Sequence, residues 1–131
     1  MFYFIKITVC SLPLLWASIF AANAVELAGS EWGIEKPVEQ FIKFSGDGKV
    51  SGYAGCNRFF GTYTIEKPKG KITIGPLAST KKACEQSVMD AERGFMNKLE
   101  SAKNFKRKRL HLNLFDENDK RILRMVWRDF D

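Results

Sequence analysis

The side chains of this sequence best suited to covalent chemistry are the cysteines Cys10, Cys56 and Cys84 and the single histidine, His111. A cysteine nucleophile needs a base beside it, and nothing in the spacing of these residues favours a pair with His111. One histidine, the cysteines and scattered carboxylates also form no recognisable metal-ligand pattern. We therefore expect no catalytic residues, no metal and no cofactor, and predict that the protein is not an enzyme.

Two further patterns could serve catalysis or phosphate binding. The acidic pairs at 90 and 92 and at 116 and 117 are neighbours only in sequence, and no predicted cleft would push their pKa values apart. The segment 50–63 contains Gly52, Gly55 and Gly61. It lacks both the P-loop lysine and the strand-to-helix context of a dinucleotide site. We expect the glycines to permit tight bends or close backbone approach, with Asn57 where the chain turns.

The N-terminus has the organisation of a cleavable signal peptide. Lys6 precedes an apolar run over residues 7–20, and Ala22-Asn23-Ala24 has the A-x-A form of a cleavage site. An uncleaved membrane anchor is the alternative, but this run is short for a spanning helix and contains a proline. Cys10 lies too early for lipidation. We predict a signal peptide over 1–24, a single domain over 25–131 and a periplasmic or secreted location with no stable membrane anchor after cleavage.

Cleavage changes how the cysteines are interpreted. It removes Cys10 and leaves Cys56 and Cys84, and two cysteines in an oxidising compartment favour a disulfide. The alternative is two separate buried thiols. It also removes Lys6, so the formal net charge falls from +6 to about +5.

A basic stretch follows the predicted helix. Lys103 and the run Lys106–Arg109 flank Phe105. Such cations could contact phosphates while the aromatic ring stacks on a base. An exported protein seldom meets nucleic acid, and lysines are common on solvated strand edges. We therefore predict no nucleic-acid partner.

The periodicity of the chain predicts short strands and one helix. Apolar residues at 88, 91, 95 and 99 form one helical stripe, which predicts a helix over about 87–100 with Ser87 as its N-cap. Leu110, Leu112 and Leu114 alternate with polar residues, as do Leu123, Met125 and Trp127. The predicted strands cover 38–44, 49–53, 58–65, 71–74, 104–108, 110–114 and 123–127. The predicted fold is α+β and mostly β: a curved antiparallel sheet or partial β-barrel of about eight short strands with one packed α-helix.

Several of these residues together resemble the META domain family, which includes the bacterial HslJ-like heat-shock proteins. The resemblance rests on Trp32, Gly52, Gly55, Cys56, Asn57, Gly61, Tyr63, Thr80, Ala83 and Cys84, and it closes with Trp127-Arg128-Asp129-Phe130. It implies a small curved sheet or partial barrel with one helix. It also implies an exported or lipid-anchored protein associated with heat or envelope stress, and it supplies no catalytic residue or cofactor.

We expect an exported, non-enzymatic and monomeric protein that supports envelope or heat-stress tolerance by binding another envelope protein. Two alternatives stay open at this point. A curved barrel can hold a small apolar ligand, and an exposed loop can inhibit an envelope enzyme.

Overall fold

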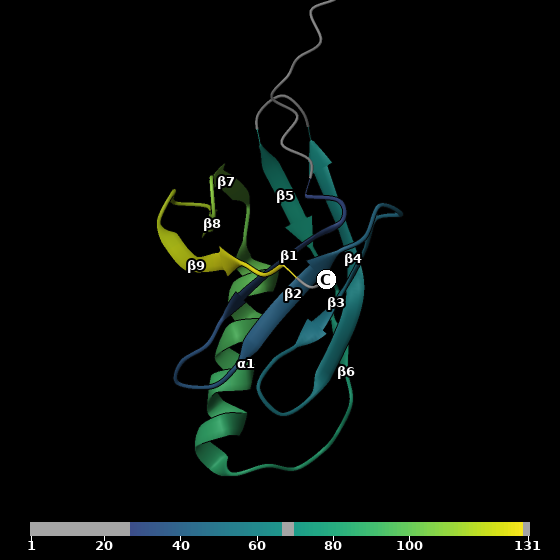
Figure 1. Cartoon of the computed structure of the whole chain (residues 1–131), viewed down its shortest axis with the longest axis vertical. Coiled ribbons are helices and arrows are strands. Elements are labelled where there is room, and N and C mark those ends of the chain that lie inside the picture. Colours follow the sequence, from purple (N-terminus) through teal and green to yellow (C-terminus); the bar gives the residue numbers. More distant parts are fainter. Residues whose placement is uncertain (1–26, 67–69, 130–131) are drawn as a thin grey trace, which may run out of the picture.

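The computed structural model describes residues 27–66 and 70–129. Within these residues the chain forms one antiparallel sheet of nine strands and one helix, α1 (Gln86–Ser101) (Figure 1). No helix of the described part is long and apolar enough to cross a membrane. The predicted signal peptide and Phe130 lie outside the described residues.

The strands follow one another in a ring-like sheet. They are β1 (Ser30–Ile34), β2 (Gln40–Phe44), β3 (Lys49–Tyr53), β4 (Arg58–Glu66), β5 (Lys71–Ile74), β6 (Ala78–Ser79), β7 (Asn104–Lys108), β8 (His111–Phe115) and β9 (Arg121–Trp127). Their order is β3-β2-β1-β9-β8-β7-β5-β4-β6, and an additional β3–β4 pairing closes the ring, with β6 attached to the outer side of β4 in that order.

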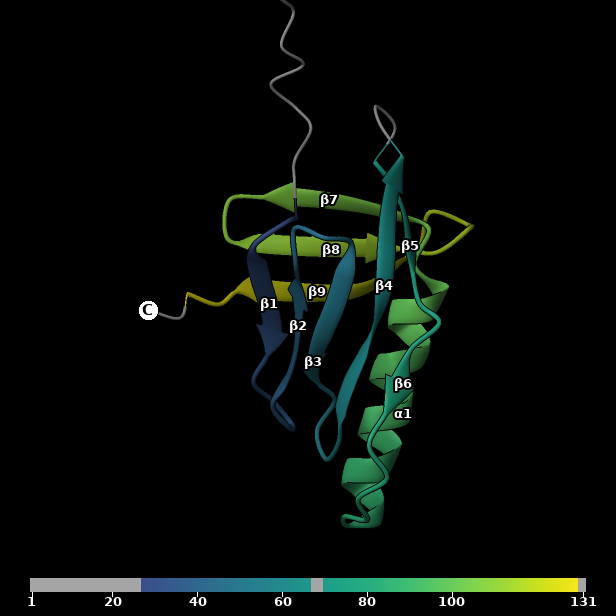
Figure 2. The same ribbon diagram turned by 90° about the vertical axis from the view of Figure 1, so that its right-hand side faces the viewer.

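The ring has two strand groups that cross. In Figure 2 the group β1 to β4 runs upright, whereas β7, β8 and β9 run across it. The groups join through narrow seams: Trp32 and Gly33 of β1 pair with Trp127 and Val126 of β9, and Lys71 of β5 pairs with Asn104 of β7. The short seams allow the sheet to change direction while its backbone stays paired.

The inside of the ring is packed with apolar side chains. Inward positions alternate with outward ones along each strand, as the two-residue period requires, and Trp32, Phe44, Phe59 and Met125 are among the largest fully buried side chains. Helix α1 contributes Phe95 and Leu99 to the same core, and the Phe95 ring meets Phe59 edge-on at 6.1 Å between centroids. The helix stripe therefore packs on the sheet, as its spacing predicts.

The predicted fold class is confirmed, with corrections at particular residues. Ser87 is not the N-cap: the helix begins at Gln86, and the Glu85 carbonyl accepts the N–H groups of Val88 and Met89. Leu110 does not point inward, because it lies in the turn between β7 and β8. His111 is half-buried on the strand β8. Strands β1 and β6 were not predicted: β1 pairs over five residues with β2 and over two with the distant β9, and β6 pairs with two residues of β4.

Candidate functional site

The Gly-rich segment after β3 makes a bend that presents Asn57 to the loop before α1. Gly55 has a φ of +122°, a conformation that residues with a Cβ rarely adopt. The Ala54 N–H then donates to the Asn57 carbonyl at 2.9 Å, which closes the bend. Asn57 itself is buried. The glycine pattern thus serves chain geometry rather than a phosphate.

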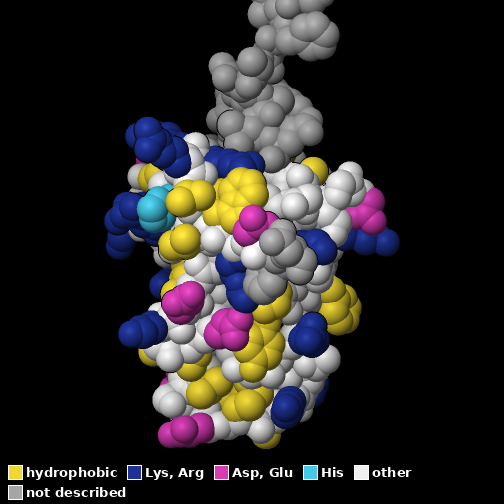
Figure 3. Space-filling model, in the orientation of Figure 1, with side chains coloured by type: hydrophobic (Ala, Val, Ile, Leu, Met, Phe, Trp, Pro, Cys, Tyr) yellow, Lys and Arg dark blue, Asp and Glu magenta, His cyan; other side chains and the backbone are white. Residues whose placement is uncertain are grey.

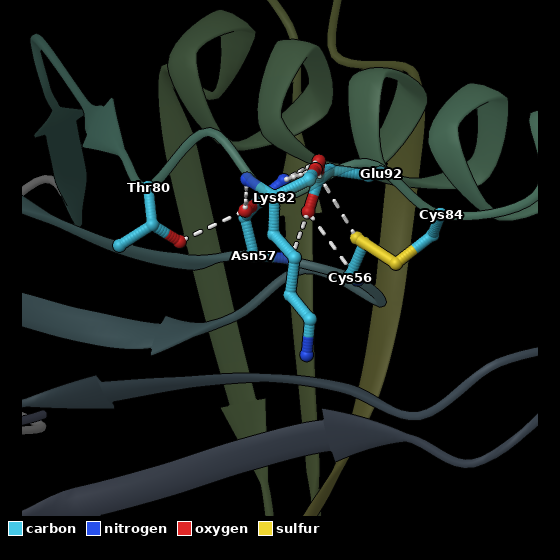
Figure 4. Close-up of a disulfide and its surroundings, with 6 residues drawn as sticks. All are labelled: Cys56, Asn57, Thr80, Lys82, Cys84 and Glu92. Carbon is cyan, nitrogen blue, oxygen red and sulfur yellow. Dashed lines mark hydrogen bonds between the residues drawn. A yellow bond between two sulfur atoms is a disulfide. The ribbon is translucent and has the colours of Figure 1, made fainter.

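Asn57 and Glu92 hold three segments together (Figure 4). The Asn57 amide Nδ2 donates to Glu92 Oε2 at 2.8 Å and to the Lys82 carbonyl at 3.0 Å. Asn57 Oδ1 accepts the Lys82 N–H at 2.6 Å and the Thr80 hydroxyl at 2.9 Å. Glu92 Oε1 accepts the backbone N–H groups of Asn57 and Cys56 at 2.5 and 3.3 Å. We call these residues, with Cys84, the Asn57 cluster.

A disulfide between Cys56 and Cys84 closes the same cluster. The predicted pairing is therefore present, and it joins the bend after β3 to the residue two before α1. A disulfide is compatible with an exported protein. The side-chain hydrogen-bonding atoms of Asn57 and Glu92 already have protein partners. We therefore interpret the cluster as a stabilising hydrogen-bond network rather than a substrate-binding site.

A cleft of about 810 Å³ lies elsewhere, between the end of β1, the β1–β2 connection and the end of β9. Its apolar lining includes Ile34, Val126 and Trp127. The charged residues of its lining are Glu35, Lys36, Glu39, Arg124 and Arg128. A lining that combines apolar and charged side chains is typical of a site that binds a peptide or protein segment.

Neighbouring side chains fix the positions of Trp127 and Arg128. Trp127 meets the buried Trp32 edge-on at 5.6 Å, and the Arg107 guanidinium lies 4.6 Å from the Trp127 ring centroid. Arg128 forms an ion pair with Glu39 at 2.7 Å and stacks over the Phe41 ring at 4.3 Å. The two cleft residues are therefore held in place before any partner binds.

Gly33 allows the Arg128 side chain to cross β1. A Cβ at Gly33 would lie 2.6 Å from Arg128 Cδ and 2.8 Å from the Gln40 carbonyl oxygen. Both distances are shorter than real Cβ contacts, so a larger residue would displace the cleft wall.

Nearby, partial burial raises the pKa of the Glu31 carboxyl, while Arg128 and Lys43 oppose that rise and Glu39 adds to it.

The family model for the META domain matches residues 22–128, which is most of the chain. The chain belongs to the META domain family. No curated protein matches it.

Solved structures show the same fold. An NMR structure of a protein from Burkholderia xenovorans has a TM-score of 0.64 at 20% identity, over 79% of this chain and 85% of that one. A crystal structure of a DUF4847 family protein from Bacteroides vulgatus has a TM-score of 0.56 at 21% identity, over 70% of this chain and 61% of that one. These likenesses concern the fold alone.

The residues that carry the META resemblance fall into two groups. Cys56, Asn57, Thr80 and Cys84 meet in the Asn57 cluster, next to Gly55. The other residues support the sheet or lie outside the core. The Trp32 indole N–H donates to Ser30 Oγ, and the Tyr63 hydroxyl donates to the Ser45 carbonyl. Gly52 lies against the Phe41 carbonyl and the Phe59 ring, Gly61 lies against Pro76, and Ala83 is exposed.

Sequence reasoning missed Glu92 as a partner of Asn57. The available signal was its place on the buried helical stripe, four residues after Val88 and three before Phe95. A carboxylate at such a position predicts a buried acceptor with donors supplied from another segment.

Among the described residues, no group of three or more His, Cys, Asp or Glu is arranged to hold a metal ion.

Proposed function

We propose that this META-family chain is an exported, monomeric, non-enzymatic protein that binds another envelope protein through the cleft beside β9. Through that interaction it supports tolerance of heat or envelope stress. The domain supplies a rigid scaffold, the Asn57 cluster and disulfide stabilise it outside the cytoplasm, and the cleft supplies the contact surface.

The observation that carries this proposal is the pairing of exposed apolar residues with ordered charged ones in the cleft. Val126 and Trp127 are 49% and 38% exposed, although both belong to β9. Tryptophan and arginine contribute disproportionately to binding energy in protein interfaces. Because Trp32, Arg107, Glu39 and Phe41 already contact the side chains of Trp127 and Arg128, little side-chain entropy is lost on binding.

Affinity capture followed by binding measurements tests this function. The protein is expressed with its own leader in an export-competent bacterium, and partners are captured from envelope extract and then purified. We expect a stoichiometric protein partner whose affinity falls on the order of tenfold in Val126→Ser, since an apolar contact at the centre of a small interface contributes about 1 to 2 kcal/mol.

Phe60→Ser is the matched control, because Phe60 is also an exposed strand residue, at 56% exposed, but does not line the cleft. Equal loss of affinity in Val126→Ser and Phe60→Ser would show that binding does not use the cleft. The role in stress follows from complementation: a deletion strain should regain heat and antibiotic tolerance with Phe60→Ser and not with Val126→Ser. A deletion strain that tolerates both stresses normally would contradict that role.

A further inference from the structure

The positive charge of the protein is concentrated in one strand group. The segments 104–115 and 121–127, which hold β7, β8 and β9, contain six cations and neither Asp nor Glu: Lys106, Arg107, Lys108, Arg109, Arg121 and Arg124. The whole chain has 21 Lys and Arg against 15 Asp and Glu. The rest of the chain is therefore balanced, with 15 residues of each sign, and these strands carry the entire excess.

The strand register places three of these cations, Lys106, Lys108 and Arg124, on one outward face. Phe105, Leu112, Leu114 and Met125 are buried, so the residues that alternate with them point away from the core. Lys108, His111 and Val126 pair across the three strands, and Lys106, Asn113 and Arg124 form the adjacent row. We call these six residues the basic face.

Exposed apolar side chains border the basic face at one end. Leu110, at 59% exposed, lies in the β7–β8 turn beside Arg109, and its carbonyl accepts the Trp127 N–H at 2.8 Å. Val126 belongs to the face itself. In Figure 3 apolar side chains lie next to Lys and Arg side chains in the upper left part of the surface. A surface whose charged side chains are all positive and which is bordered by exposed apolar side chains is unusual if it faces only water.

We propose that the basic face docks reversibly on an anionic lipid bilayer. Cations over such a surface are attracted to acidic headgroups, and the exposed aliphatic side chains of Leu110 and Val126 favour the boundary between headgroups and acyl chains. A nucleic acid would use the cations but would leave Leu110 and Val126 without a role. This docking goes beyond the proposed protein binding, and it places the cleft next to the membrane surface because Arg124 and Val126 belong to both.

Vesicle sedimentation with the exported protein tests the docking. Vesicles of phosphatidylcholine alone are compared with vesicles that also contain phosphatidylglycerol, at increasing NaCl. We expect binding only to the anionic vesicles, weakening as salt screens the charges. Removing a cation costs about fivefold in partitioning, so Lys106→Gln/Lys108→Gln/Arg109→Gln should lower it on the order of 100-fold. None of these three residues lines the cleft.

The matched control, Lys49→Gln/Lys81→Gln/Lys98→Gln, removes the same charge from exposed positions elsewhere and should retain binding within about threefold. Leu110→Ser, which tests the apolar border without changing charge, should weaken binding several-fold.

The proposal is overturned by absence of binding to anionic vesicles or by equal losses in the two triple variants. Tighter binding of a single-stranded oligonucleotide, lost in Lys106→Gln/Lys108→Gln/Arg109→Gln, would instead assign the surface to nucleic acid. Near-ultraviolet circular dichroism confirms the fold of each variant.

Discussion

At the scale of single residues, Glu92 is the side chain on which the Asn57 cluster most depends. It is 7% exposed and accepts N–H groups from both Cys56 and Asn57. Glu92→Gln would replace one acceptor oxygen with an amide that faces other donors. We expect a loss of about 2 to 3 kcal/mol in the free energy of unfolding, because buried donors lose a charged partner. Urea unfolding of both proteins with the disulfide intact measures this difference in the free energy of unfolding.

Glu100→Gln provides the comparison for Glu92→Gln. Glu100 lies on the same helix but is exposed, so its replacement should change the free energy of unfolding by less than about 0.5 kcal/mol. Equal effects of the two substitutions would mean that the buried hydrogen bonds of Glu92 contribute nothing specific.

Glu31 gives a prediction about pH. Partial burial raises the pKa of this carboxyl above its usual value of 4.5, against the opposing effect of Arg128 and Lys43. Because the pKa of Glu31 is raised in the folded state, the contribution of this carboxyl to the free energy of unfolding is complete at low pH. That contribution is lost as the pH rises through the folded-state pKa. Glu31→Gln should therefore gain stability relative to the wild type between pH 3 and pH 7. A relative loss over that interval, measured by urea unfolding at each pH, would contradict the assigned cause.

At the scale of elements, the disulfide links the bend after β3 to the start of α1. Its cysteines are separated by 28 residues, and a cross-link over such a loop contributes about 3 to 4 kcal/mol in the chain-entropy account. Cys56→Ser/Cys84→Ser should lose that amount in chemical unfolding and should retain the cleft, which shares no residue with the bridge. Reduced wild-type protein should unfold at the same denaturant concentration as the double variant.

The wall of the cleft depends on the absence of a side chain at Gly33. Gly33→Ala should destabilise the protein by about 1 to 3 kcal/mol, because the new methyl group overlaps Arg128 and the Gln40 carbonyl. The control is Gly94→Ala, whose Cβ would meet nothing within 4 Å. In a helix this change should stabilise by about 0.5 to 1 kcal/mol. Opposite signs for the two glycines in thermal unfolding would support both assignments.

The sequence predicted elements whose side chains carry a local period and missed those defined by distant partners. Strands β3, β5 and β7 match their predicted ranges because alternation and flanking turns mark them. The two-residue β6 has no such pattern, since it exists through pairing with Phe59 and Phe60. Glycines and Asn57 indicated a bend, but the partner Glu92 lies 35 residues away, and no local pattern specifies that contact.

At the scale of the whole molecule, the two proposed surfaces meet along β9 and serve different partners. The cleft contains both carboxylates and cations, which suits a protein partner with mixed polarity. The basic face contains cations without carboxylates, which suits an anionic surface. The disulfide and the Asn57 cluster share no residue with the cleft or the basic face, so changes there should alter stability before they alter binding.

The cleft as a protein-binding site is the central claim, and site-specific photo-cross-linking in living cells tests it most directly. A photoreactive residue at position 126, 36 or 60 is introduced into the full-length protein, which is then exported under heat stress. Positions 126 and 36 line the cleft and position 60 does not. We predict one discrete protein adduct from positions 126 and 36 and none from position 60. The same adduct from all three positions, or none from the two cleft positions, would contradict the claim.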